Sequence, residues 1–349
     1  MRVALCLSGQ PRLYKECYEW IKAFIIDEYG VDNVDVFCHF WWDGESGFPA
    51  LSVWNEHMHD SDSFRNKDED IEKNMIKLYN PKGIQYHKQD DLVNRFYNGD
   101  KTQLRNDRDN VYKIWQDTGV SLWDNYPKVY QKYMRANLKQ IFESQGYCQQ
   151  LKLNYEKENK FKYDLVIRTR YDLAFHPHYN LEKDELNPPF RGSVWNGKFG
   201  NFPSLEEIKQ MFNNEELMLE YEGKEHRATG VPNIITEWDN LWMYPSENHD
   251  ILMDKMCNQF DYYFKQIVGE TKMVTASGKE YDYNHVDILA IPEHLQETVC
   301  RDTETRGTDW LGGCGLSALL WIPRDIKSLN DSKENWKKAI KAGHKGEIW

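Results

Sequence analysis

Apolar residues recur along the N-terminal part of the chain with two different spacings, which predict alternating strands and helices. Short apolar runs predict buried strands at Arg2–Leu7, Val34–Trp42 and Ile84–His87. Helical spacing predicts one helix from about Leu13 to Glu28 and another over Ile71–Tyr79. Because a chain that alternates strand and helix builds a mostly parallel sheet covered by helices, we expect an α/β fold.

The pattern is less regular after the third predicted strand. Tyr126–Tyr155 keeps a helical period, with a kink or a fresh start expected at Gly146, and Tyr163–Leu173 is typical of an apolar strand that runs directly into charge. Asp43–Asp70 and Asp90–Asp117 are polar, and we expect a long loop in each. The remaining predicted elements are a Pro- and Gly-rich crossing at Leu181–Gly200, a helix at Leu205–Met218, a strand at Asn233–Tyr244, a helix at Asn248–Val268, a strand-to-helix transition at Val286–Val299 and a short basic helix at Asp331–Ala342.

Composition and charge narrow the classes of protein to which the chain can belong. It has 349 residues, of which 40% are hydrophobic, and a formal net charge of −12. This size allows a large buried core, whereas the acidic balance argues against a nucleic-acid partner, because phosphate neutralisation needs clustered Lys and Arg. Aromatic residues make up 14% of the chain, which suits either an aromatic core or rings that stack on sugars and nucleobases.

The cysteine pattern and the distribution of apolar runs indicate the compartment. The seven cysteines include no C-x-x-C pair, which is typical of free thiols in a reducing environment. The N-terminal apolar run is too short for a signal peptide, and no run is long enough to span a membrane. We therefore expect a cytoplasmic protein without a transmembrane segment.

The segment Tyr163–Leu173 carries the most informative chemistry. In an extended strand every second side chain points to the same face, so Arg168, Arg170 and Asp172 would share one face. They would lie at the carboxyl end of the strand, where ligands bind in open α/β sheets. Arginine gives bidentate contacts to phosphate oxygens, and a carboxylate can hold Mg²⁺ or Mn²⁺ against the same oxygens. The pattern predicts a diphosphate site with a metal at Asp172; a structural Arg–Asp pair that closes the strand is the alternative.

The loop after the first predicted strand offers a second set of ligand groups. Gly9 allows close approach of the backbone to a ligand, Pro11 fixes the turn, and Arg12 can reach a phosphate. The loop is neither a G-x-x-x-x-G-K phosphate loop nor a G-x-G-x-x-G fingerprint, so kinases and dehydrogenases lose support. An ordinary strand-to-helix turn is the alternative interpretation.

Two of these segments, Ala4–Arg12 and Tyr163–Asp172, in combination resemble a group of bacterial, phage and large-virus glycosyltransferases of the GT-A type. Weaker matches to the same group are Asp35–His39 with Trp41, Tyr79–Lys82, Ser144–Tyr147, Trp238–Asn240 and Pro292–Glu293. The matches cover the chain discontinuously as far as the Pro292–Glu293 pair.

The resemblance implies a GT-A-like, Rossmann-like fold with a mostly parallel central sheet flanked by helices and a C-terminal acceptor-side region. Residues 1–175 would bind the nucleotide sugar, residues 176–325 would form the acceptor-binding and catalytic region of the same compact fold, and residues 326–349 would form a helical tail. The implied activity is transfer of a hexose or pentose from a nucleotide-diphosphate donor to a glycan, glycoprotein or glycolipid acceptor.

The resemblance also implies roles for individual residues. Ser8, Gly9, Gln10 and Arg12 would lie under the base and ribose of the donor, and Arg168, Arg170 and Asp172 would bind its diphosphate. Where this fold type usually carries Asp-x-Asp for the metal, the chain has Arg170-Tyr171-Asp172, which leaves Asp172 as the ligand for Mn²⁺ or Mg²⁺.

Acid–base chemistry in an inverting transferase needs a carboxylate that accepts the proton of the acceptor hydroxyl. Asp239 is the first candidate because it follows an apolar pair and is flanked by Trp238 and Trp242; Glu237, Glu293 and Asp309 are the others. A turn Asp or a helix cap is the alternative for Asp239. His39 is predicted to be a buried, hydrogen-bonded histidine rather than a catalytic one.

Two other functions stay open at this point. A nucleotidyltransferase, or another phosphoryl-transfer enzyme, would use similar Arg and Asp groups. A non-enzymatic carbohydrate-binding protein would account for the Trp and Tyr content.

Overall fold

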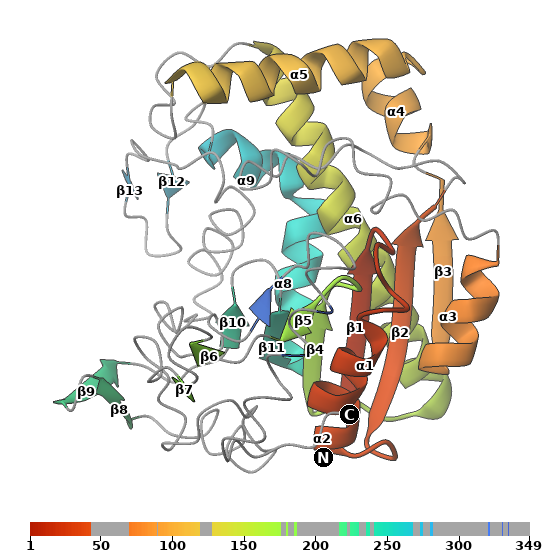
Figure 1. Ribbon diagram of the computed structural model, residues 1–349, viewed down its shortest axis with the longest axis vertical. Coiled ribbons are helices and arrows are strands. Elements are labelled where there is room, and N and C mark those ends of the chain that lie inside the picture. The colour runs from red at the N-terminus through yellow and green to blue at the C-terminus, as the bar shows by residue number, and fades with distance from the viewer. Residues whose placement is uncertain are drawn as a thin grey trace.

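The computed structural model describes residues 1–42, 70–88, 90–118, 128–175 and 241–267, and the short segments 179–180, 185–186, 216–221, 224–229, 235–237, 273–274, 280–281, 320–321, 330 and 334. Within these residues a six-stranded sheet has the order β10-β11-β4-β1-β2-β3 (Figure 1). Its strands are β1 (Val3–Gly9), β2 (Val34–Trp41), β3 (Gly83–His87), β4 (Leu165–Thr169), β10 (Ile235–Glu237) and β11 (Leu241–Pro245).

The sheet is mixed but mostly parallel. β1 pairs in parallel with both β2 and β4, and β2 pairs in parallel with β3. β11 is antiparallel to β4, and β10 is antiparallel to β11. The α/β class predicted from the alternation of elements is therefore confirmed. The strands β10 and β11 extend the sheet formed by residues 1–175, so the central sheet draws on two of the regions predicted along the chain.

Helices cover both faces of this sheet. The helical elements are α1 (Tyr18–Ile21), the π-helical turn η1 (Lys22–Ile26), α2 (Asp27–Tyr29), α3 (Ile71–Tyr79), α4 (Asp90–Tyr97), α5 (Lys101–Thr118), α6 (Lys128–Asn159), α8 (Ser246–Asn258) and α9 (Phe260–Ile267). Four two-stranded ladders complete the described elements: β5 (Ala174–Phe175) with β14 (Leu320–Trp321), β6 (Tyr179–Asn180) with β7 (Glu185–Leu186), β8 (Glu216–Tyr221) with β9 (Lys224–Thr229), and β12 (Met273–Val274) with β13 (Glu280–Tyr281).

The continuous apolar runs of the central strands follow from burial on both faces. In β1, Leu5 and Leu7 belong to the core shared with Trp20 of α1, whereas Cys6 belongs to the core on the opposite face, shared with Cys148 of α6. A parallel strand covered on both faces has no polar side, so its sequence does not alternate.

Helix α6 links the sheet to a helical layer beyond the sheet's carboxyl edge. It has 32 residues. Its later part packs on β1, β2 and β3, and its earlier part packs against α5 and α4 (Figure 1). A second core joins Trp41 and Trp242 to Tyr97, Phe142 and Phe260. The expected fresh start of a helix at Gly146 is wrong, because α6 continues through it. The glycine instead permits close approach of α8, since a Cβ there would lie 2.5 Å from Cys257 Sγ.

Four other predicted elements differ from the observed ones. Asp90–Asp117 forms α4 and most of α5 rather than a loop, because apolar residues such as Val93, Tyr97 and Leu104 are buried at helical spacing between the charges. The predicted helix at Leu205–Met218 is wrong at its end, where β8 begins at Glu216.

The other two differences are divisions of a predicted element. The strand predicted over Asn233–Tyr244 is the antiparallel pair β10 and β11, and the helix predicted over Asn248–Val268 is α8 and α9. None of the helices in the described ranges is long and apolar enough to cross a membrane. The five cysteines described, Cys6, Cys17, Cys38, Cys148 and Cys257, are free thiols, as predicted.

Candidate functional site

The carboxyl edge of the parallel strands is the natural place for a ligand in this topology. β1, β2, β3 and β4 end there at Gly9, Trp41, His87 and Thr169. The loops after β1 and β4 leave the sheet side by side, because these two strands are hydrogen-bonded neighbours with Leu7 opposite Thr169. The two segments that sequence analysis singled out therefore lie next to each other.

Asp172 joins two arginines from these two loops. Both Asp172 carboxylate oxygens accept hydrogen bonds from Arg170, at 2.8 Å from Nε and 3.0 Å from Nη2. Arg12, from the loop after β1, forms an ion pair with Asp172 Oδ2 at 3.1 Å. The Asp172 side chain is 1% exposed, whereas Arg12 and Arg170 are 13% and 24% exposed. The three side chains form a partly accessible group, the Arg12–Asp172–Arg170 cluster.

The electrostatic balance at Asp172 favours the carboxylate. Burial by itself would raise the pKa of this carboxyl group. The charges of Arg170 and Arg12 and the hydrogen bonds from Arg170 outweigh burial, and the pKa lies below its ordinary value of 3.8. The carboxylate is therefore ionised at neutral pH and fixes both guanidinium groups.

This environment does not fit the expected divalent cation at Asp172. Both oxygens already accept hydrogen bonds from guanidinium groups, whose positive charges would repel a metal ion. Across the described parts of the chain, no three His, Cys, Asp or Glu side chains are grouped so that they could hold a metal ion. Asp172 forms an Arg–Asp pair at the end of the strand, and the metal stays a prediction.

Arg168 does not share a face with Arg170 and Asp172, so that part of the prediction is wrong. β4 ends at Thr169, and the chain bends at Tyr171 and Asp172, so the alternation of an extended strand does not reach them. Arg168 is 2% exposed and points toward α6 and α8. It donates to Gln145 Oε1 at 2.6 Å, and its guanidinium lies 4.8 Å from the centre of the Trp242 ring.

The loop after β1 has the open glycine and the turn that its sequence predicts. Gly9 has φ +114°, and a Cβ placed on it would meet no described atom within 4 Å. Ser8 is 6% exposed. The backbone N–H of Arg12 donates to the carbonyl of Gln10 at 2.9 Å, which turns the chain so that Arg12 reaches Asp172. Ser8, Gly9, Gln10 and Arg12 thus lie at the carboxyl edge of the sheet.

A histidine cluster at the same edge was only partly predicted. His39 is fully buried, and its Nδ1 lies 2.7 Å from Ser144 Oγ while its Nε2 lies 2.9 Å from His87 Nδ1. The Tyr147 ring stacks on His39 and contacts His87, at centroid distances of 4.9 Å and 4.2 Å. Burial, and next the neighbouring His87, lower the pKa of His39 to about 3, so His39 is neutral.

The prediction of a buried, hydrogen-bonded His39 is confirmed. Ser144, His87 and Tyr147 received no role from the sequence. The position of His87 at the end of a strand was an available signal, because the end of a neighbouring parallel strand meets the same edge.

One of the four candidate catalytic carboxylates, Glu237, lies within the described residues. Asp239, Glu293 and Asp309 lie outside them. The backbone of Glu237 pairs with Leu241, which is itself opposite Thr169. Glu237 therefore ends β10 at the level where β4 ends, on the carboxyl edge of the sheet.

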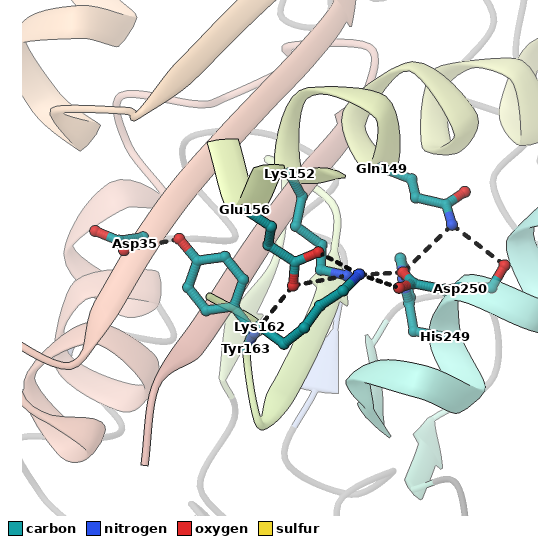
Figure 2. Close-up of polar contacts among 8 residues, drawn as sticks. All are labelled: Asp35, Gln149, Lys152, Glu156, Lys162, Tyr163, His249 and Asp250. Atoms are coloured by element: carbon teal, nitrogen blue, oxygen red, sulfur yellow. Dashed lines mark hydrogen bonds and ion pairs between the residues drawn. The ribbon is translucent and has the colours of Figure 1, made fainter. Parts of the chain in front are cut away.

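A separate network of charged residues lies at the opposite, amino edge of the sheet (Figure 2). Lys152, whose side chain is fully buried, pairs with Asp250 at 2.7 Å and with Glu156 at 3.4 Å. Glu156 also accepts the backbone N–H of Tyr163, just before β4, at 2.9 Å. This network joins the end of α6 to the start of α8 and to the sheet, so its role is structural.

Comparison with known proteins adds no assignment. The chain matches no protein-family model, no curated protein and no solved structure.

Proposed function

We propose that this protein is a glycosyltransferase of the GT-A type, which transfers a hexose or pentose from a nucleotide-diphosphate donor to a glycan, glycoprotein or glycolipid acceptor. The observation that carries the proposal is the Arg12–Asp172–Arg170 cluster at the carboxyl edge of a mostly parallel sheet. Its two guanidinium groups, both partly exposed, suit the diphosphate of such a donor.

The chemistry of the proposed reaction sets the role of each group. When the bond between the sugar and the diphosphate breaks, negative charge grows on the leaving phosphate. Arg12 and Arg170, already oriented by Asp172, stabilise that charge without reorganising. A Cβ on Gly9 would meet no described atom within 4 Å, which suits close approach of the nucleoside to this backbone. Glu237, with Asp239 and Glu293, remains a candidate base for the acceptor hydroxyl.

The expected Mn²⁺ or Mg²⁺ stays a prediction, and Asp172 is not its favoured ligand in this proposal. Two arginines at the diphosphate supply positive charge that a cation would otherwise provide. A cytoplasmic location, expected from the cysteine pattern, is part of the same proposal.

The direct test is a thermal-shift panel of nucleoside diphosphates and their sugars, each with and without Mn²⁺. A ligand that binds only the folded protein stabilises it by RT ln(1 + [L]/Kd) and so raises the melting temperature. We expect one nucleoside diphosphate and its sugar to stabilise the protein, and turnover of that sugar to release the nucleoside diphosphate. The absence of any shift across the panel refutes the proposal. Release of pyrophosphate instead identifies a nucleotidyltransferase, and glycan binding without nucleotide binding identifies a carbohydrate-binding protein.

A further inference from the structure

We propose that His39 is a positioning residue that holds the two arginine loops at a fixed separation, through its ring on one side and its backbone carbonyl on the other. The inference rests on the proposed function, because the separation matters only if Arg12 and Arg170 bind one diphosphate. His39 lies on β2, which pairs with β1 and carries neither arginine. It therefore acts through other residues and does not contact the reacting groups.

The first connection runs through Ser144 of α6 to the loop after β1. The backbone N–H of Gly9 donates to Ser144 Oγ at 2.8 Å, and Ser144 Oγ lies 2.7 Å from His39 Nδ1. Ser144 is fully buried, so no water replaces either contact without cost. Gly9 is the residue at which the chain leaves β1, so its position sets where Arg12 begins its approach.

The second connection runs through Tyr171 to the loop after β4. The Tyr171 hydroxyl donates to the carbonyl oxygens of Leu7 and His39, at 3.0 Å and 3.1 Å. Tyr171 is fully buried and stands between Arg170 and Asp172 in the sequence. The phenol therefore fixes the loop after β4 against both β1 and β2.

The contacts close into a ring that begins and ends at His39. The ring runs from His39 through Ser144 and Gly9 to Arg12, crosses to Asp172 by the ion pair of 3.1 Å, and returns through Tyr171. The imidazole is held in turn from β3 and α6, by the contact of Nε2 with His87 and by the stacked ring of Tyr147. A shift at His39 therefore moves both loops together.

Two substitutions of His39 distinguish the roles of its two ring nitrogens. Asparagine places a polar atom near the position of Nδ1, and glutamine places one near Nε2. His39→Asn keeps a partner for Ser144, whereas His39→Gln keeps a partner for His87. Ser144→Ala and Tyr171→Phe remove the two connections one at a time. Matched controls at the amino edge are Ser246→Ala, which removes a buried hydroxyl with no hydrogen bond among the described residues, and Tyr163→Phe, which removes a hydrogen bond to Asp35.

Amide hydrogen exchange tests the coupling without a ligand. We expect Ser144→Ala, Tyr171→Phe and His39→Gln each to speed exchange in both residues 8–12 and residues 170–172, and the two controls to leave these segments unchanged. Exchange that rises in only one loop, or equally in the controls, overturns the proposal.

Binding of the nucleoside diphosphate that stabilises the wild-type protein supplies the second measurement. We expect Ser144→Ala and His39→Gln to weaken its affinity by roughly fivefold to tenfold, about the value of one hydrogen bond, and His39→Asn to weaken it less. Equal losses in His39→Asn and His39→Gln overturn the role of Nδ1. If no nucleoside diphosphate binds the wild-type protein, the proposed function fails, and the exchange measurement still decides the coupling between the loops.

Discussion

Replacing Asp172 by Asn tests the Arg12–Asp172–Arg170 cluster most directly, because the substitution keeps the size of the side chain and removes its charge. In the wild-type protein the carboxylate accepts two hydrogen bonds from Arg170 and pairs with Arg12. Breaking a buried ion pair by removing one partner costs about 3–5 kcal/mol. Arg12 and Arg170 are 13% and 24% exposed, so water partly solvates their released charges and places the loss near the lower limit, at about 3 kcal/mol.

The assay is urea unfolding of Asp172→Asn and the wild-type protein at several pH values. The pKa of Asp172 is lowered in the folded protein, because Arg170 and Arg12 outweigh burial. The carboxylate therefore contributes stability above the ordinary, unfolded pKa of 3.8, and this contribution is lost as the pH falls through the lower folded pKa. We expect the difference in unfolding free energy to be full at pH 7 and to narrow only below about pH 4.

Two results would refute this reasoning. If Asp172→Asn is as stable as the wild-type protein at pH 7, Asp172 does not anchor the two arginines. If the difference persists unchanged at the lowest pH at which the protein folds, it comes from packing and not from charge. Lys22→Gln, which breaks an exposed Lys–Asp pair, is the matched control and should change stability by less than about 1 kcal/mol.

Three further predictions use the same cluster and the buried histidines. Arg12→Ala should weaken binding of the stabilising nucleoside diphosphate by at least about tenfold in calorimetry, since a hydrogen bond to a charged group contributes about 1.5–3 kcal/mol. The control Lys15→Ala, at an exposed lysine nearby, should leave the affinity unchanged. Equal losses of affinity in the two variants would argue against a specific role for Arg12. The thermal shift caused by Mn²⁺ should be the same in Asp172→Asn and the wild-type protein, because Asp172 is held by guanidiniums; a shift lost in the variant would restore Asp172 as a metal ligand. Burial lowers the pKa of His39 to about 3, with a smaller contribution from the neighbouring His87, and burial also lowers the pKa of His249 to about 4. Because each unfolded histidine binds a proton below about pH 6.5, each should remove about 2 kcal/mol of stability between pH 7 and pH 5 in urea titrations, and a flat profile would contradict this.

The local pattern of apolar residues was enough to predict the strands that are buried on both faces. The buried strands β1 and β2 were predictable because both faces of a parallel strand are covered, which leaves runs such as Val3–Leu7 almost wholly apolar. The helices α4 and α5 were missed because charged residues dominate their exposed faces, and only a few apolar positions such as Val93 and Tyr97 reveal the buried side.

The sequence also determined which residues reach the carboxyl edge of the sheet, since that follows from the strand that each residue terminates. Tertiary structure alone decided their partners. β4 ends at Thr169, and this single boundary sends Arg168 toward α6 and α8 while Arg170 and Asp172 meet Arg12. The contacts of His39 with Ser144 and Tyr171 span 105 and 132 residues along the chain. No periodicity within one segment reports such contacts, because they depend on how separate strands and helices pack.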